Sequence, residues 1–209
     1  MAGPRSSNGT PSGSRRIGLL GGTFDPPHHG HLEAARTALG ALELDAVVLV
    51  VANDPWQKTA GGQVVTPAEV RLTMVRAAAD GMDRIEVDDL EIRRGGPSYT
   101  ADTVAKYAQQ GPDDQLFVLV GSDIAPGLDA WARPDEIRRY ATIVVMDRPG
   151  HIGARPPSGW DYVGLKGTFP DLTGTDLRAM VEAGGTAAEA VPEVVARLIE
   201  DHDLYETCR

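Results

Sequence analysis

The feature that most constrains the fold is an alternation of short apolar runs with helix-like segments. The longest apolar run covers residues 46–52 and suits a strand buried on both faces. Further strand-like runs cover residues 17–20, 85–87, 116–120, 143–146 and 162–165. Strands that alternate with helices form a parallel sheet with helices on both faces. We therefore expect a single α/β domain built on a doubly wound parallel sheet.

The helix-like segments carry their own start and stop signals. Thr66, Pro67 and Glu69 predict a capped helix start, with Thr66 as the N-cap. Thr100 is expected to cap another helix, which ends before Gly111 in a left-handed turn. The helices are predicted at residues 30–42, 67–79, 101–110, 176–182 and 192–201.

Composition indicates a tail before the domain and two long loops within it. Residues 1–14 are rich in Gly, Ser and Pro and predict a flexible tail before a domain at residues 15–209. Residues 53–65 and 149–159 are rich in Gly, Pro or polar residues and predict mobile loops, which often close over substrates.

Charge and apolar content narrow the function class. The formal net charge of −10 argues against broad contact with nucleic acid, which needs clustered Lys and Arg. No apolar run approaches the roughly 18 residues of a membrane span, and the one cysteine, Cys208, excludes an intrachain disulfide. These observations predict a cytoplasmic protein with no membrane or nucleic-acid partner. A small anionic substrate needs only a local cluster of donors, for which the candidates are His28, His31, Lys58, Arg148 and Arg178.

The segment that follows the first predicted strand has the residues of a phosphate site. It reads GGTFDPPHHGH from Gly21 to His31 and leads into a predicted helix, whose N-terminus favours anions. Gly21 and Gly22 allow a nucleotide to approach the backbone, and Gly30 leaves room for an adenine ring. His28 and His31 share one helical face and could stabilise charge on an α-phosphate.

Other interpretations of this segment are weaker. Paired histidines can bind zinc, but no third ligand stands at a familiar spacing. The glycine pattern is not the G-x-G-x-x-G of dinucleotide-binding oxidoreductases. A capped helix with surface histidines is the simplest alternative, and the glycines and prolines argue against it.

With these residues the chain resembles the HxGH nucleotidyltransferases, and within them the bacterial nicotinate mononucleotide adenylyltransferases. The signature is His28-His29-Gly30-His31, and the resemblance extends over nearly all of residues 15–207. It implies a Rossmann-like sheet, with catalytic roles for His28 and His31. It also implies ATP binding by a set of residues in this segment: Gly21, Gly22, Thr23, Phe24 and Gly30.

Three later segments extend the resemblance to the substrates. GPSYT at residues 96–100 resembles the segment whose Tyr and Thr help to form the nicotinate pocket, which implies Tyr99 and Thr100. Gly121-Ser122-Asp123 resembles a Gly-Ala-Asp element and implies that Asp123 contacts ribose, with Ser in place of Ala. Trp131 matches the aromatic residue that stacks on the pyridine ring.

Two further segments depart from the family pattern. Residues 54–58 read DPWQK where the family has Pro-Pro-His-Lys, so Lys58 aligns as a phosphate ligand while Trp56 or Gln57 replaces the histidine. Residues 172–178 resemble the second signature, Ser-Ser-Thr-x-x-Arg, with Thr173 and Gly174 in place of the serines. Thr173 and Thr175 are expected to hold the triphosphate, and Arg178 the leaving pyrophosphate.

The resemblance implies transfer of the adenylyl group of ATP to nicotinate mononucleotide, giving deamido-NAD and pyrophosphate. Mg²⁺ is expected to bind mainly through ATP phosphates and water, with no protein metal site. The sequence leaves open the amide substrate, nicotinamide mononucleotide, and a homo-oligomer. It disfavours phosphopantetheine adenylyl transfer, a non-catalytic nucleotide sensor and a fragment of a class I aminoacyl-tRNA synthetase.

Overall fold

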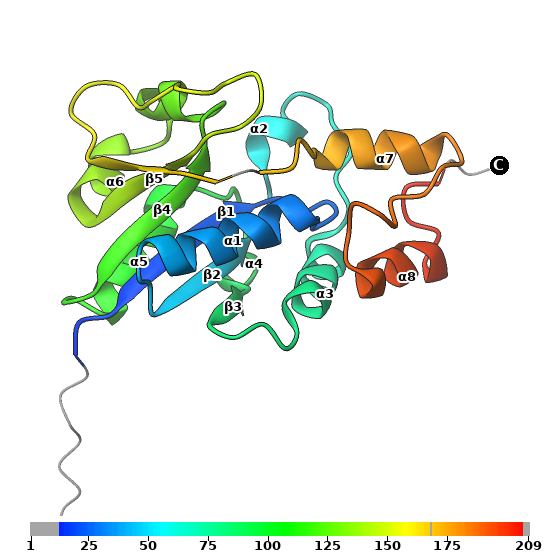
Figure 1. Ribbon diagram of the computed structural model, residues 1–209, viewed down its shortest axis with the longest axis horizontal. Helices are drawn as coiled ribbons and strands as arrows, with labels where there is room; N and C mark the ends of the chain where they lie inside the picture. The colour runs from blue at the N-terminus through cyan, green and yellow to red at the C-terminus, as the bar shows by residue number, and fades with distance from the viewer. Residues whose placement is uncertain (1–12, 168, 207–209) are drawn as a thin grey trace, which may run out of the picture.

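The computed structural model describes residues 13–167 and 169–206, and a six-stranded parallel sheet forms its centre (Figure 1). The strand order is β3-β2-β1-β4-β5-β6, which confirms the predicted α/β fold with a single doubly wound sheet. All six expected strands are present: β1 (Arg16–Gly22), β2 (Ala46–Val51), β3 (Ile85–Asp88), β4 (Gln115–Gly121), β5 (Ala141–Met146) and β6 (Tyr162–Leu165).

The strand order reverses between the neighbours β1 and β4. After β1 the chain moves outward to β2 and β3, and it then returns to place β4 on the other side of β1. In open parallel sheets ligands bind at such a switch point, beyond the carboxyl ends of the strands. The topology therefore places the candidate site after β1 and β4.

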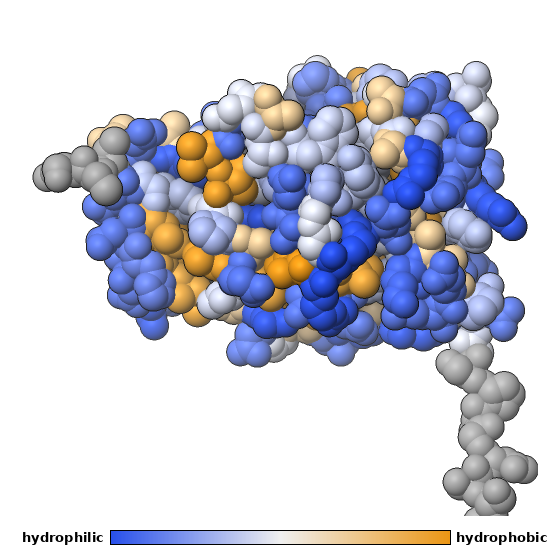
Figure 2. Space-filling model, turned by 180° about the vertical axis from the view of Figure 1, so that it is seen from behind, coloured by the Kyte–Doolittle hydropathy of each residue, from blue (hydrophilic) through white to orange (hydrophobic). Residues whose placement is uncertain are grey.

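Helices cover both faces of the sheet. On one face α1 (His29–Ala41), α3 (Ala68–Ala79), α7 (Gly174–Glu182) and α8 (Glu193–Asp201) contribute to one apolar core. On the other face lie α5 (Thr100–Gln110), the 3₁₀ helix η1 (Ala125–Ala130) and α6 (Pro134–Tyr140), which pack around a second core. Seen from behind the view of Figure 1, the surface of the molecule is largely hydrophilic, with hydrophobic side chains in small groups (Figure 2).

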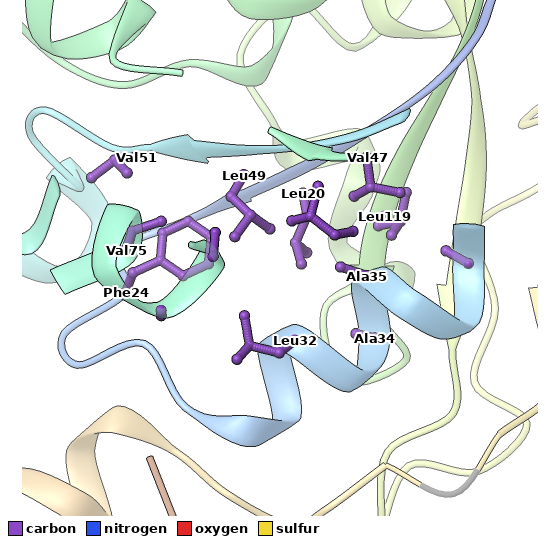
Figure 3. Close-up of a cluster of buried hydrophobic side chains, with 14 of the residues drawn as sticks. Leu20, Phe24, Leu32, Ala34, Ala35, Val47, Leu49, Val51, Val75 and Leu119 are labelled. Carbon is purple, nitrogen blue, oxygen red and sulfur yellow. The ribbon is translucent and has the colours of Figure 1, made fainter. Parts of the chain in front are cut away.

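Successive side chains of a strand point to opposite faces of the sheet, so each strand contributes to both cores. In β2 all six residues are buried; Val47, Leu49 and Val51 join the α1 side, whereas Val48 and Val50 join the α5 side. Figure 3 shows Leu32, Ala34 and Ala35 of α1 facing the strand side chains. The small side chains of Ala34 and Ala35 let α1 lie close to the sheet, with its N-terminus beside the end of β1.

Four short helices were missed by the sequence analysis: α2 (Trp56–Thr59), α4 (Leu90–Arg94), η1 and α6. Each spans two turns or fewer, so its apolar spacing cannot be distinguished from that of a loop. The predicted loop at residues 53–65 therefore contains α2, while residues 147–161 between β5 and β6 are irregular.

Three predicted helix ends were wrong. Pro67, not Thr66, is the N-cap of α3, because tertiary hydrogen bonds hold Thr66 outside the helix. Tyr99 is the N-cap of α5, so Thr100 is its first helical residue. Gly111 has a φ of −132° rather than a left-handed conformation.

The predicted tail lies outside the described residues at positions 1–12, as does Cys208. Within the described part of the chain, no helix is long and apolar enough to cross a membrane.

Candidate active site

A cavity of about 440 Å³ opens at the switch point between β1 and β4. Nearly all of the site residues predicted from the sequence line it, although they come from six separate segments. These are Gly21, Gly22, Thr23, His28, Gly30, His31, Lys58, Tyr99, Thr100, Asp123, Trp131, Thr173 and Thr175.

Two predicted site residues do not line this cavity. Phe24 is only 2% exposed and belongs to the core, where its ring meets the edge of His31 with the centroids 4.8 Å apart. Arg178 lies beside the cavity and donates a 2.6 Å hydrogen bond from Nη1 to the carbonyl oxygen of Asp25. Of these two residues, Phe24 packs against His31 in the core and does not face the cavity. Its apolar side chain could have indicated this position.

The two histidines form one stacked unit at the start of α1. Their ring centroids are 3.7 Å apart, and the main-chain N–H of His28 donates to Nδ1 of His31 at 3.2 Å. Because Nδ1 of His31 accepts this bond, its proton is placed on Nε2, where it is available as a donor. Among the described residues, no group pairs with the buried Nδ1 of His28.

Burial keeps both imidazoles neutral. Desolvation lowers the pKa of His28 to about 4, and the positive charges of Arg148 and His29 add to the effect. The pKa of His31 also falls well below its ordinary value, first through burial and then through His28, Arg148 and Lys58. Groups with such low pKa values are weak bases at neutral pH, so the geometry suits hydrogen-bond donation rather than proton abstraction.

The glycines have different surroundings. A side chain at Gly21 would meet nothing within 4 Å, whereas a Cβ at Gly22 would lie 3.0 Å from the Phe24 ring. At Gly30 a Cβ would lie 3.0 Å from Nδ1 of His28. A side chain at Gly30 would therefore crowd the His28 ring, while the room expected there for an adenine ring stays a prediction.

Two basic residues of the cavity lie near the histidines, Lys58 and Arg148. Lys58 lies on α2, and its pKa is lowered by desolvation and by Arg178 and Arg71, while Asp25 opposes the shift. Arg148 follows β5 and lines the cavity; its guanidinium donates to Asp123 at 3.4 Å and to the Leu172 carbonyl at 3.2 Å. The sequence named Arg148 as a candidate donor for a small anion, and its position after β5 brings it to the cavity.

Aromatic side chains line another part of the cavity. Tyr99 and Trp131 were expected there, and Trp56 joins them with its ring centroid 5.9 Å from that of Tyr99. Because α5 begins at Thr100, the unpaired N–H groups of its first turn start at the cavity wall.

A buried carboxylate in the same cavity was missed. Glu91 is 6% exposed, and its Oε1 accepts a hydrogen bond from Oγ1 of Thr103 at 2.5 Å. In the sequence it stands within LEIRR, where nothing local distinguishes a buried glutamate from a solvated one.

Residues 172–178, which resemble the second family signature, contain the start of α7 and pack against the histidine segment. Thr173 is the N-cap, and its Oγ1 accepts a hydrogen bond from the main chain of Asp176 at 3.1 Å. A Cβ at Gly174 would lie 2.6 Å from the carbonyl oxygen of Asp25, so only glycine fits without a shift of the backbone. The glycine that replaces the family's serine thereby lets α7 approach the histidine segment closely.

Comparison with known proteins agrees with this geometry. Residues 19–183 match the model of the cytidylyltransferase-like family. A protein from Gemmatimonas aurantiaca named "probable nicotinate-nucleotide adenylyltransferase" is 39% identical over 197 residues, covering 91% of this chain and 92% of that protein. A protein of the same name from Shouchella clausii is 38% identical over 191 residues, covering 91% of this chain and 97% of its own.

Solved structures share the fold at low identity. The Plasmodium falciparum nicotinic acid mononucleotide adenylyltransferase complexed with NaAD superposes with a TM-score of 0.76 at 15% identity, covering 91% of this chain and 97% of that one. Its complex with APC gives a TM-score of 0.74 at 13% identity with the same coverage. The resemblance drawn from the motifs is confirmed: this chain belongs to the cytidylyltransferase-like family, among the nicotinate-nucleotide adenylyltransferases.

Proposed function

We propose that this protein transfers the adenylyl group of ATP to nicotinate mononucleotide, giving deamido-NAD and pyrophosphate. The observation that carries the proposal is that one cavity joins the stacked His28 and His31 to the aromatic wall of Tyr99 and Trp131. A phosphate site and a flat apolar site in one space suit two nucleotides that react with each other. The names of the relatives support the same reaction.

In the proposed mechanism the mononucleotide phosphate attacks the α-phosphorus of ATP in line. A P–O bond forms to the attacking oxygen, the bond to the β-phosphate oxygen breaks, and pyrophosphate leaves with that electron pair. The attacking phosphate is already ionised at neutral pH, so no side-chain base is required. Catalysis then depends on positioning and on stabilising charge.

We assign separate roles to the neutral and the charged donors. His28 and His31 would donate N–H hydrogen bonds to the α-phosphate oxygens as negative charge builds there. Lys58 would neutralise the β- and γ-phosphates from α2, and Arg178 would do so from α7. Thr173 and Thr175 would hold the same phosphates at the N-terminus of α7.

The nucleosides would occupy the remaining walls. Gly21, Gly22, Thr23 and Gly30 would contact the adenosine side, and Asp123 would accept hydrogen bonds from ribose hydroxyls. Trp131 and Tyr99 would contact the pyridine ring, while the first turn of α5 at Thr100 would bind its carboxylate. Phe24 is expected to act through His31, since its ring lies in the core.

We propose Mg²⁺ as the cofactor, bound mainly by ATP phosphates and water. Among residues 13–167 and 169–206, no group of three or more His, Cys, Asp and Glu side chains could enclose a metal. The residues beside the proposed phosphate positions are neutral or basic, which fits a cation that arrives with the nucleotide. Bound there, Mg²⁺ would offset part of the phosphate charge.

The amide, nicotinamide mononucleotide, is a second candidate because of Glu91. Its buried carboxylate lines the cavity near Tyr99 and Thr100, and a carboxylate accepts a bond from an amide NH₂ but repels another carboxylate. Replacement of Glu91 by Gln should raise kcat/KM for the acid relative to the amide if the side chain faces this substituent.

The decisive experiment is pyrophosphate release from Mg²⁺-ATP with three acceptors: nicotinate mononucleotide, its amide and phosphopantetheine. We expect the highest kcat/KM with the acid and formation of deamido-NAD in equal amount to pyrophosphate. Release with none of the acceptors would favour a non-catalytic nucleotide sensor. A higher kcat/KM with the amide or phosphopantetheine would reassign the substrate.

A further inference from the structure

Arg71 of α3 is a buried arginine that the proposed chemistry does not use. It is 1% exposed and heads the largest fully buried side chains of the molecule. It does not line the cavity, yet it lies behind the segment that carries the histidines. Burial of a guanidinium is costly unless its N–H groups are satisfied, so its partners indicate what it does.

The guanidinium donates to three main-chain carbonyls from three separate segments. Nη1 donates to Thr23 after β1 at 2.7 Å, and Nη2 donates to Asn53 after β2 at 3.0 Å. Nε donates to Thr66, just before α3, at 2.7 Å. The planar guanidinium has N–H donors in fixed directions and can hold three carbonyls at fixed spacing. A lysine ammonium group lacks this planar arrangement of donors.

The Asn53 bond extends this link to the substrate segment. The main-chain N–H of Asn53 donates to Oγ of Ser98 at 2.9 Å, and its side-chain amide donates to the Gly96 carbonyl at 2.9 Å. Ser98 immediately precedes Tyr99, and Asn53 is the first residue of the loop that carries Lys58. Through Asn53, Arg71 therefore supports both the aromatic wall and the base of the lysine loop.

The Thr66 bond returns to the histidine segment. The main-chain N–H of Thr66 donates to Oδ2 of Asp25 at 3.1 Å, while Tyr205 donates to Oδ1 at 2.8 Å. In the described part of the chain no carboxylate lies within 4.0 Å of the Arg71 guanidinium. Asp25 still stabilises its charge through space and opposes the lowering of the Arg71 pKa by burial.

We propose that Arg71 is a positioning residue for adenylyl transfer, which sets the spacing between the ATP-side segment at Thr23 and the mononucleotide-side segment at Asn53. This inference rests on the proposed function. The two substrates react in line, and a displacement of about 1 Å between them can cost on the order of 100-fold in rate. A group that holds both segments without touching either substrate controls that displacement.

The test compares Arg71→Lys with a matched control, Arg76→Met, which removes an exposed arginine of the same helix. Arg71→Lys keeps the positive charge but loses the planar arrangement of donors. We expect kcat to fall by about 10- to 100-fold, with less than about threefold change in KM for ATP. Arg76→Met should keep the wild-type kcat. A folded Arg71→Lys enzyme with wild-type kcat would overturn the proposal.

A coupling experiment separates positioning from general stability. Ser98→Ala removes the acceptor of the Asn53 N–H, so its effect on kcat should be less than additive with Arg71→Lys. Thr186→Ala, at an exposed turn before α8, is the additive control. Additive effects for both pairs would contradict a link through Asn53.

Two further measurements cover enzymes that fold poorly or lack turnover. If Arg71→Lys does not fold, the Arg71→Ala variant is tested with added guanidinium ion, which should restore kcat. An Arg71→Ala protein that folds but gains no activity from the guanidinium ion would contradict the inference. Hydrogen exchange in the wild type and the variant needs no activity: amides at residues 22–25 and 52–54 should exchange faster in the variant. Unchanged exchange there would refute the role of Arg71, whereas absence of turnover in the wild type would refute only the proposed function.

Discussion

The histidine segment and the lysine loop face the same cavity but differ in burial. Phe24, Asp25 and His28 are 2%, 3% and 6% exposed, and hydrogen bonds hold this segment from several sides. Residues 56–62 are exposed throughout and contain only the single turn of α2. One wall of the cavity is therefore preorganised, while the other carries a cation near solvent.

The two walls of the cavity differ in the kind of hydrogen-bond donor that they offer. Burial that fixes the position of an imidazole also removes its charge, so the inner wall can offer only neutral N–H donors. Lys58 is exposed on a single helical turn, so its flexible side chain keeps more freedom to follow a phosphate, although neighbouring groups partly desolvate its ammonium group. The inner wall therefore supplies neutral donors and the loop wall supplies a positive charge.

Replacement of His31 by Asn should have the largest effect on the rate. The Asn Oδ1 can take the place of Nδ1 and still accept from the His28 main chain, but the distal Nε2–H is lost. We expect kcat to fall by about 100- to 1000-fold, the typical loss of one transition-state donor. The measurement is pyrophosphate release, with thermal unfolding as the check on stability. Turnover within a few-fold of the wild type would contradict the donor role.

Acid should destabilise the inner wall through His28. Its pKa is about 4 when folded against 6.5 for the free side chain, so between these pH values the unfolded chain takes up a proton that the folded chain excludes. The resulting stability is fully present above pH 6.5 and is lost as pH falls toward 4, by about 3 kcal/mol in total. Urea unfolding from pH 7 to pH 4.5 should show a shallower slope in His28→Asn. Equal slopes would show that His28 is not buried neutral.

Removal of the Lys58 charge should lower the rate less than loss of His31. Lys58→Met keeps the aliphatic stem, and we expect kcat to fall by about tenfold because one charge-assisted contact is lost. The exposed position predicts a stability change within about 0.5 kcal/mol. Lys106→Met, an exposed lysine on α5, is the matched control. If Lys58→Met lost as much activity as His31→Asn, the division between the walls would be wrong.

Loss of the Thr173 cap should have the smallest effect. Thr173→Ala removes the acceptor for the Asp176 N–H and should lower the free energy of unfolding by about 1 kcal/mol. We also expect a few-fold rise in KM for ATP, since Thr173 lines the cavity. Thr186→Ala removes a comparable local bond away from the cavity. A rise in KM in both variants would indicate a general effect on stability instead.

Much of the site could be predicted because its residues stand at the ends of strands. The carboxyl ends of parallel strands meet at one edge, so motifs after β1 and β4 had to converge once the alternation was recognised. The missed features concern orientation: Phe24 turns into the core, Glu91 faces the cavity and Arg71 is buried. Local sequence does not show which way such side chains point.

The six parallel strands, the main helices and the segments that form the site could be predicted from the sequence, because strand and helix periodicity and glycine-rich turns are local properties. Packing of distant segments was needed to show that Gly174 must meet the Asp25 carbonyl, that Arg178 lies beside the cavity and that Arg71 binds three main-chain carbonyls. These contacts connect residues far apart in the chain: Arg178 and Asp25 are separated by 153 positions, and Tyr205 and Asp25 by 180. Such pairs meet only when the sheet and its helices have packed, so their chemistry is a property of the folded molecule.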